Sequence, residues 1–122
     1  MDKPLALVAD DAPSVRSLMK TVLEMQGYSV LAVEDGKKAY DALKDGYRAQ
    51  MVLTDLDMPE MNGLELVKNA VTLDPNIACI VLSGGWSAAT PEQLKSAGAK
   101  ETLNKPFDIG TLKSLIDKYT RA

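Results

Sequence analysis

Residues 51–63 read Met-Val-Leu-Thr-Asp-Leu-Asp-Met-Pro-Glu-Met-Asn-Gly, an apolar run followed by two aspartates and a proline. The run at 51–54 is almost wholly apolar, which is typical of a strand buried between two layers of helices. Beyond the loop, Leu64, Val67 and Val71 follow a helical period, and Asn62 is placed to cap that helix. This stretch therefore predicts a buried strand, an acidic loop and an amphipathic helix.

The same unit recurs along the rest of the chain. Four further apolar runs predict strands, at Leu5–Ala9, Tyr28–Val33, Ile77–Leu82 and, more weakly, Glu101–Asn104. Helical spacing predicts three further helices, with stripes at Val15/Leu18/Met19/Val22, Ala39/Ala42/Leu43 and Leu112/Leu115/Ile116/Tyr119. Thr90-Pro91-Glu92-Gln93 reads as a capping box that starts another helix, and Asp108 is placed to cap the last one. Glycines are positioned to end three of these helices, at Gly27, Gly46 and Gly98.

Strands that alternate with helices predict an α/β domain with a parallel sheet and right-handed crossovers. We expect a single doubly wound (βα)₅ domain over residues 1–122, with helices on both faces of the sheet. The apolar runs at 5–9, 51–54 and 77–82 suit central strands, whereas the polar run at 101–104 suits an edge.

Composition excludes several classes of function. The 122 residues include no histidine, which removes Ser-His-Asp and Cys-His nucleophile systems and histidine-ligated metals. The formal net charge of −3 disfavours nucleic acid as a partner. The single cysteine, Cys79, permits no internal disulfide, and the five apolar residues at 5–9 are too few for a signal-peptide core or a membrane span. We expect a cytoplasmic protein with no membrane partner.

Polar residues follow four of the predicted strands. The first strand ends in Asp10 and Asp11, the third in Asp55, the fourth in Ser83 and the fifth in Asn104-Lys105-Pro106. Each group alone is also typical of a solvated turn or a helix cap. However, ligands of open parallel sheets bind at the carboxyl ends of the strands, where all of these groups are predicted to meet.

The chemistry of this set indicates phosphoryl transfer. Clustered carboxylates without histidine or cysteine favour Mg²⁺, which prefers hard oxygen ligands. A magnesium ion with a lysine and a hydroxyl can neutralise and hydrogen-bond the oxygens of a transferring phosphoryl group. A carboxylate can itself be the nucleophile and form an acyl phosphate, and Asp55 is the most central of the three.

Four segments resemble the receiver domain of two-component response regulators, in the same order and spacing as in that family. They are Leu7–Asp11, Leu53–Gly63, Val81–Gly84 and Asn104–Phe107, of which the Asp-x-x-Met-Pro-x-Met-Asn-Gly stretch is the most specific. The resemblance covers the whole chain and implies the flavodoxin-like sheet order 2-1-3-4-5. It also implies a histidine kinase or phosphotransfer protein as phosphodonor and a downstream protein as target.

The resemblance implies a role for each site residue. Asp55 would be the phosphoacceptor, and Mg²⁺ would be held by Asp10, Asp11, Asp55 and the backbone carbonyl of Asp57. Ser83 would be the switch hydroxyl, and Lys105 would pair with the phosphoryl group. The family usually has a cis peptide at the position of Lys105-Pro106.

The sequence departs from the family at two positions. Thr102 stands where receivers commonly have a Tyr or Phe that rotates on activation, and a threonine cannot fill or vacate an aromatic pocket. The side chain of Asp57 adds a carboxylate beside the site. We therefore predict that movement of Ser83 passes through the 84–89 loop, which includes the only tryptophan, Trp86. The sequence is equally compatible with two roles for Trp86, namely packing against the following helix and contact with a partner.

The favoured interpretation is a stand-alone receiver that catalyses only its own phosphorylation and dephosphorylation, with protein contact as its output. It would be a monomer, or a dimer when phosphorylated. Excision from a longer protein is an alternative. Asp55-Leu56-Asp57 also resembles the Asp-x-Asp of haloacid-dehalogenase-type phosphohydrolases, although this short chain lacks a cap to enclose a substrate. A degenerate scaffold that takes no phosphate is a third hypothesis.

Overall fold

The computed structural model describes residues 3–120, in which five strands and five helices alternate. They are β1 (Leu5–Ala9), α1 (Pro13–Met25), β2 (Ser29–Val33), α2 (Gly36–Lys44), β3 (Ala49–Asp55), α3 (Gly63–Leu73), β4 (Ala78–Ser83), α4 (Pro91–Ala97), β5 (Glu101–Asn104) and α5 (Ile109–Tyr119). The strands form one parallel sheet in the order β2-β1-β3-β4-β5. The predicted (βα)₅ architecture and sheet order are confirmed.

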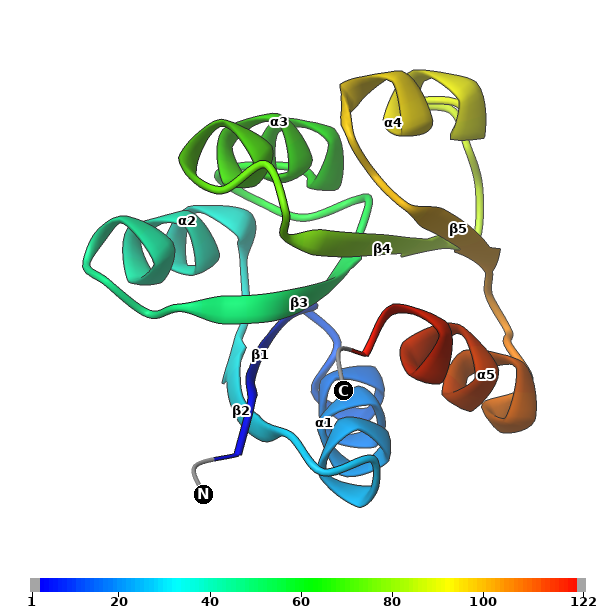
Figure 1. Cartoon of the computed structure of the whole chain (residues 1–122). Coiled ribbons are helices and arrows are strands. Elements are labelled where there is room, and N and C mark those ends of the chain that lie inside the picture. The colour runs from blue at the N-terminus through cyan, green and yellow to red at the C-terminus, as the bar shows by residue number, and fades with distance from the viewer. Residues whose placement is uncertain (1–2, 121–122) are drawn as a thin grey trace.

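Helices cover both faces of the sheet. Figure 1 shows α1 and α5 on one face and α2, α3 and α4 on the other. Successive residues of a strand point to opposite faces, so Val52 packs beneath α2, α3 and α4 while Leu53 packs beneath α1 and α5. The core is thus two apolar layers separated by the sheet, and the parallel sheet is covered on both sides.

Burial separates the central strands from the edges. Every residue of β4 is buried, and β1 is buried from Ala6 to Ala9. The edge strand β5 is half-buried and ends in the exposed Asn104, and β2 forms the other edge. The expectation that the runs at 5–9, 51–54 and 77–82 are central is confirmed.

Helix caps lie where the sequence places them. Asn62 and Glu65 form a complete capping box at the start of α3, and Thr90 and Gln93 form another at the start of α4. The carboxylate of Asp108 accepts a hydrogen bond from the backbone of Thr111 in α5. These caps satisfy backbone N–H groups that have no partner within the helix, and thereby set where each helix begins.

The structure differs from the predicted strand bounds mainly at β3. This strand begins at Ala49, two residues before the apolar run, because Ala49 pairs with Leu5 of β1 across a local irregularity in register. Its other end agrees with the prediction, because the strand ends at Asp55, which pairs with Leu82 of β4. Asp55 is therefore part of the sheet rather than of the following loop, and strand pairing fixes its backbone.

The described part of the chain, residues 3–120, has no helix with the length and apolar character needed to cross a membrane.

Candidate functional site

The carboxyl ends of four adjacent strands form the site. Asp10 directly follows β1, Asp55 ends β3, Ser83 ends β4 and Lys105 directly follows β5. Because β1, β3, β4 and β5 are neighbours and parallel, these ends meet at one edge of the sheet. The predicted convergence is confirmed for Asp10, Asp11, Asp55 and Lys105.

Three carboxylates gather at this edge. Asp10, Asp11 and Asp55 each present an oxygen, and these oxygens lie within 4.8 Å of one another. Asp10 and Asp55 are buried and Asp11 is exposed, so the cluster opens to solvent on the side of Asp11. Hard, negatively charged oxygens at this spacing match the preference of Mg²⁺, which binds few protein carboxylates and retains waters. The donor set therefore fits the ion that the sequence predicts.

Lys105 bridges two of the carboxylates. Its Nζ lies 2.9 Å from Oδ2 of Asp10 and 3.2 Å from Oδ1 of Asp55. The Lys105-Pro106 peptide is cis, as the resemblance to receiver domains implies, and the backbone N–H of Lys105 donates to the carbonyl of Ser83 at 2.9 Å. Burial lowers the pKa of Lys105, but its hydrogen bond to Asp10 and the charges of both aspartates outweigh this, so the pKa is raised. The site therefore contains a fixed ammonium at neutral pH.

The chain around Asp55 orients its side chain. Oδ1 of Asp55 accepts a hydrogen bond from the backbone N–H of Leu56 at 2.9 Å, in addition to its contact with Lys105. The backbone carbonyl of Asp55 accepts from the hydroxyl of Thr54 at 2.8 Å. A Cβ at position 63 would lie 2.6 Å from that carbonyl oxygen, so Gly63 is required for α3 to start this close to the acidic loop. This close approach is the physical reason for the glycine that ends the 51–63 stretch.

Burial raises the pKa of Asp55, and the charge of Asp10 adds to this effect, while Lys105 and the N–H of Leu56 act in the opposite direction. A carboxyl group whose pKa is higher in the folded than in the unfolded chain binds protons preferentially in the folded state. Stability therefore falls as the pH rises from the ordinary aspartate pKa through the raised value of Asp55.

We therefore expect Asp55→Asn to stabilise the metal-free protein at pH 7, by about 1 kcal/mol. Asparagine has the shape of the aspartate but no charge, so it avoids the cost of burying an ionised group beside Asp10. Urea unfolding in EDTA at pH 7 and pH 3.5 would measure this difference, which should shrink at the lower pH. A variant less stable than the wild type at pH 7 would contradict the assigned electrostatics.

Asp10 is fixed by partners that the sequence did not reveal. Its Oδ1 accepts from the backbone N–H of Ala12 at 2.9 Å, and its backbone carbonyl accepts from the guanidinium of Arg16 at 2.8 Å. In the sequence, an arginine in the first turns of a helix looks the same whether its guanidinium binds a backbone carbonyl or is exposed to solvent. The contact explains how the turn between β1 and α1 keeps Asp10 beside Lys105.

Within residues 3–120, the Ser83 hydroxyl and the Asp57 carboxylate form no hydrogen bond or ion pair with the three clustered carboxylates. The Ser83 hydroxyl donates to the carbonyl of Gly85 and accepts from the Gly85 N–H at 3.1 Å, so it bonds within its own loop. Asp57 is exposed, and its carboxylate is not a member of the metal-ligand cluster found among residues 3–120. The structure therefore places both residues near the predicted edge without showing the contacts that the family roles imply.

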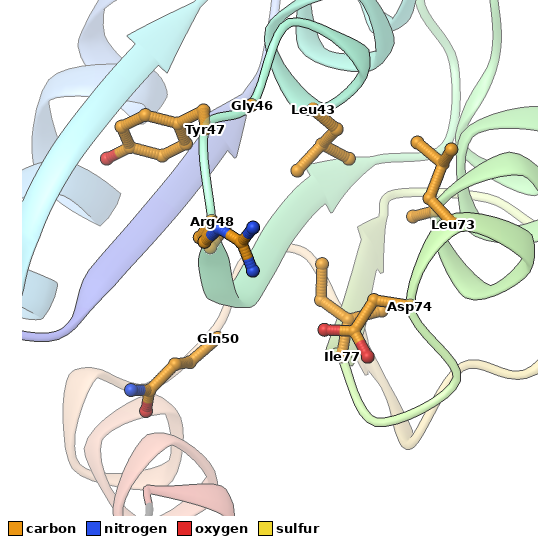
Figure 2. Close-up of a pocket in the computed structure, with 10 residues that line it drawn as sticks. Leu43, Gly46, Tyr47, Arg48, Gln50, Leu73, Asp74 and Ile77 are labelled. Carbon is orange, nitrogen blue, oxygen red and sulfur yellow. The ribbon is translucent and has the colours of Figure 1, made fainter.

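A separate hollow lies at the opposite end of the sheet. Figure 2 shows Leu43, Leu73 and Ile77 around it, with Arg48 on one side and Asp74 on the other. Its lining includes Ala49, at the start of β3, whereas the carboxylates follow the ends of the strands. This hollow therefore contributes nothing to the acidic site.

The sheet order and the lysine-bridged acidic cluster define a small doubly wound domain with three carboxylates and an ammonium at the carboxyl edge of its sheet. The chain belongs to the response regulator receiver domain family, whose model matches residues 6–117.

Individual proteins support the same assignment. The chain is 33% identical to the chemotaxis protein CheY of Thermotoga maritima, over 94% of this chain and 96% of that protein. It is 30% identical to the sporulation initiation phosphotransferase F of Bacillus subtilis, over 93% and 90% of the two chains. Among solved structures, the chemotaxis response regulator CheY4 of Vibrio cholerae superposes with a TM-score of 0.84 at 27% identity, covering 98% of this chain and 100% of that one.

These comparisons confirm the predicted class of protein. The chain is a receiver domain of two-component signal transduction, a family that is not a classical enzyme family. The haloacid-dehalogenase alternative, which rested on Asp55-Leu56-Asp57, finds no support in them.

Proposed function

We propose that Asp55 accepts a phosphoryl group from a histidine kinase or phosphotransfer protein, in a reaction that depends on Mg²⁺. The observation that supports this most directly is the position of Asp55. Its side chain is buried, it is oriented by the N–H of Leu56, and the ammonium of Lys105 bridges it to the carboxylate of Asp10. Three acidic groups and one cation at the carboxyl edge of the sheet are the parts that phosphoryl transfer needs.

The two oxygens of Asp55 have different surroundings. Oδ1 is engaged by the Leu56 N–H and by Lys105, whereas Oδ2 has no hydrogen bond within residues 3–120. We assign Oδ2 as the nucleophile. It forms the new oxygen–phosphorus bond while the phosphorus–nitrogen bond of the donor phosphohistidine breaks, and the electron pair leaves with the imidazole nitrogen. With acetyl phosphate as donor, the phosphorus–oxygen bond breaks and acetate leaves.

The residues proposed to hold Mg²⁺ are Asp10, Asp11, Asp55 and the backbone carbonyl of Asp57. A bound magnesium ion supplies positive charge to the oxygens of the phosphoryl group. Lys105 contributes a second positive charge, and its ammonium is already fixed 3.2 Å from Oδ1 of Asp55. Ser83 donates its hydroxyl to the phosphoryl group after it leaves the carbonyl of Gly85.

In this proposal, the protein turns over no metabolite and catalyses only its own phosphorylation and the later hydrolysis of the acyl phosphate. Its output is contact with a downstream protein, and residues 1–122 act as one phosphoacceptor domain. A cytoplasmic location belongs to the same proposal, supported by Cys79, which is a buried free thiol.

The test is the intact mass of the protein after incubation with acetyl phosphate, with Mg²⁺ or with EDTA. We expect one phosphoryl adduct per chain with Mg²⁺ and almost none with EDTA. Hydroxylamine should remove the adduct, because it cleaves acyl phosphates and spares phosphoserine. An adduct that forms equally well in EDTA would refute the proposed reaction, and continuous release of phosphate from a generic phosphate ester would favour the phosphohydrolase.

Asp11→Asn is expected to weaken Mg²⁺ binding by about tenfold or more, because removing a unit charge within a few ångströms of the ion costs over 1.4 kcal/mol. Asp11 is exposed, so the substitution should leave the fold intact. Isothermal titration with MgCl₂ would measure the change. Asp45→Asn is the matched control, since Asp45 is also exposed but follows α2 and is absent from the carboxylate cluster. Equal affinities in the two variants would remove Asp11 from the metal site.

A further inference from the structure

The hydroxyl of Ser83 is fully engaged in the structure. It donates to the carbonyl of Gly85 and accepts from the N–H of the same residue. Ser83 is completely buried, so its hydroxyl cannot exchange these bonds for water without a rearrangement of the loop. If Ser83 is to donate to a phosphoryl group on Asp55, it must release the carbonyl of Gly85, and that carbonyl then needs a new position or a new donor.

The residue after Gly85 joins this loop to the neighbouring strand. The indole N–H of Trp86 donates to the side-chain oxygen of Asn104 at 2.7 Å. Within residues 3–120 this is the only side-chain hydrogen bond between the 84–90 loop and β5. Asn104 pairs with Ser83 in the sheet and directly precedes Lys105, so the bond connects the two strand ends that carry the switch hydroxyl and the ammonium.

The loop has room to move once this bond is released. A Cβ built on Gly84 or on Gly85 would meet no heavy atom within 4 Å, so neither residue is confined by its surroundings. Beyond them, Ala89 is buried in the core beneath α3 and α4, and Trp86 packs against the same core. The segment therefore begins with two unconfined glycines after Ser83, and Ala89 holds its other end in the core. Between these points, one side-chain hydrogen bond joins it to β5.

We propose that the Trp86–Asn104 hydrogen bond stabilises the resting state of the switch and breaks when Ser83 turns toward a phosphoryl group on Asp55. This inference rests on the proposed function of Asp55 and Ser83. Trp86 thereby links the site to the surface of α4 and β5, a role that half-buried Thr102 cannot perform because its side chain is too small to fill or vacate a pocket. Trp86 and Asn104 are positioning residues here, since neither touches the reacting atoms.

A spectroscopic test follows from the single tryptophan, which produces one indole N–H signal in a ¹H–¹⁵N spectrum. Beryllofluoride with Mg²⁺ serves as the probe, because it mimics an acyl phosphate. We expect the indole signal to move on its addition, toward the position that it has in Asn104→Ala. Ser83→Ala should largely lose this movement and Thr102→Ala should keep it.

The fluorine spectrum of the same samples separates the two proposals. Absence of protein-bound fluorine would show that the acyl phosphate mimic does not bind, which is a failure of the proposed function. Bound fluorine with an unmoved indole signal would overturn the role of Trp86 while leaving Asp55 as phosphoacceptor. The same conclusion would follow if Thr102→Ala, rather than Ser83→Ala, abolished the movement.

A kinetic test removes the hydrogen bond from each end. Trp86→Phe keeps an aromatic ring but lacks the indole N–H, and Asn104→Ala lacks the acceptor. Each should be phosphorylated by acetyl phosphate about two- to tenfold faster than wild type. This range corresponds to the loss of one net hydrogen bond that stabilises only the resting state. The double variant should be no faster than the faster single variant, because both changes remove the same bond. Unchanged or slower rates, or accelerations that multiply in the double variant, would overturn the proposal.

Discussion

Asp55→Asn is expected to abolish the covalent phosphoryl adduct completely. The amide oxygen of asparagine is neutral and weakly nucleophilic, so no acyl phosphate can form at this position. The substituted side chain keeps the shape of the aspartate and can still accept the hydrogen bond from Leu56, so loss of the adduct would report chemistry rather than misfolding. The measurement is intact mass after incubation with acetyl phosphate and Mg²⁺, alongside a urea unfolding curve.

Asp57→Asn is the matched control for this experiment. It removes a carboxylate two residues further along the same loop, but the backbone carbonyl proposed as a metal ligand remains. Because Asp57 is exposed and lies outside the carboxylate cluster, this variant should still form one adduct. An undiminished adduct in Asp55→Asn, or its loss only in Asp57→Asn, would show that the phosphoacceptor is another residue.

Lys105→Met is expected to destabilise the metal-free protein by about 2–3 kcal/mol, which is slightly less than the usual cost of breaking a fully buried ion pair. Asp10 is completely buried and would lose its cationic partner. The cost is below that of a fully buried ion pair because the Lys105 side chain is 21% exposed. Since the pKa of Lys105 is raised, its contribution to stability is complete at neutral pH and is lost only as the pH rises above the ordinary lysine range.

The affinity for Mg²⁺ should not fall with the stability in this variant. Lys105 is a cation within 3.2 Å of two of the carboxylates, so its removal eliminates a competitor for their charge. We expect Lys105→Met to bind Mg²⁺ as tightly as wild type or more tightly, while the movement of the Trp86 indole signal on addition of beryllofluoride is lost. Lys100→Met, at an exposed lysine, should change neither stability nor metal affinity. Weaker Mg²⁺ binding in Lys105→Met would contradict the proposed roles.

Much of the fold follows from patterns between residues that are close in the sequence. The spacing Asn62 to Glu65 and Thr90 to Gln93 specifies helix starts, because a capping box forms within one turn. The apolar run at 77–82 predicts a central strand because only a strand covered on both faces tolerates such a composition. The first residues of β3 were missed, because Ala49 joins the sheet through its pairing with Leu5 rather than through its own preference.

The candidate site divides in the same way. Patterns along the chain are enough to predict which groups reach the carboxyl edge, since Asp10, Asp55 and Lys105 each directly end or follow a strand of a parallel sheet. The partners of those groups come from the packing of distant segments: Lys105 contacts Asp10 across 95 residues of sequence, and Trp86 contacts Asn104 across 18. Strand periodicity and helix caps depend on neighbouring residues, whereas a side-chain hydrogen bond depends on distances of about 3 Å that the packing of the whole sheet sets.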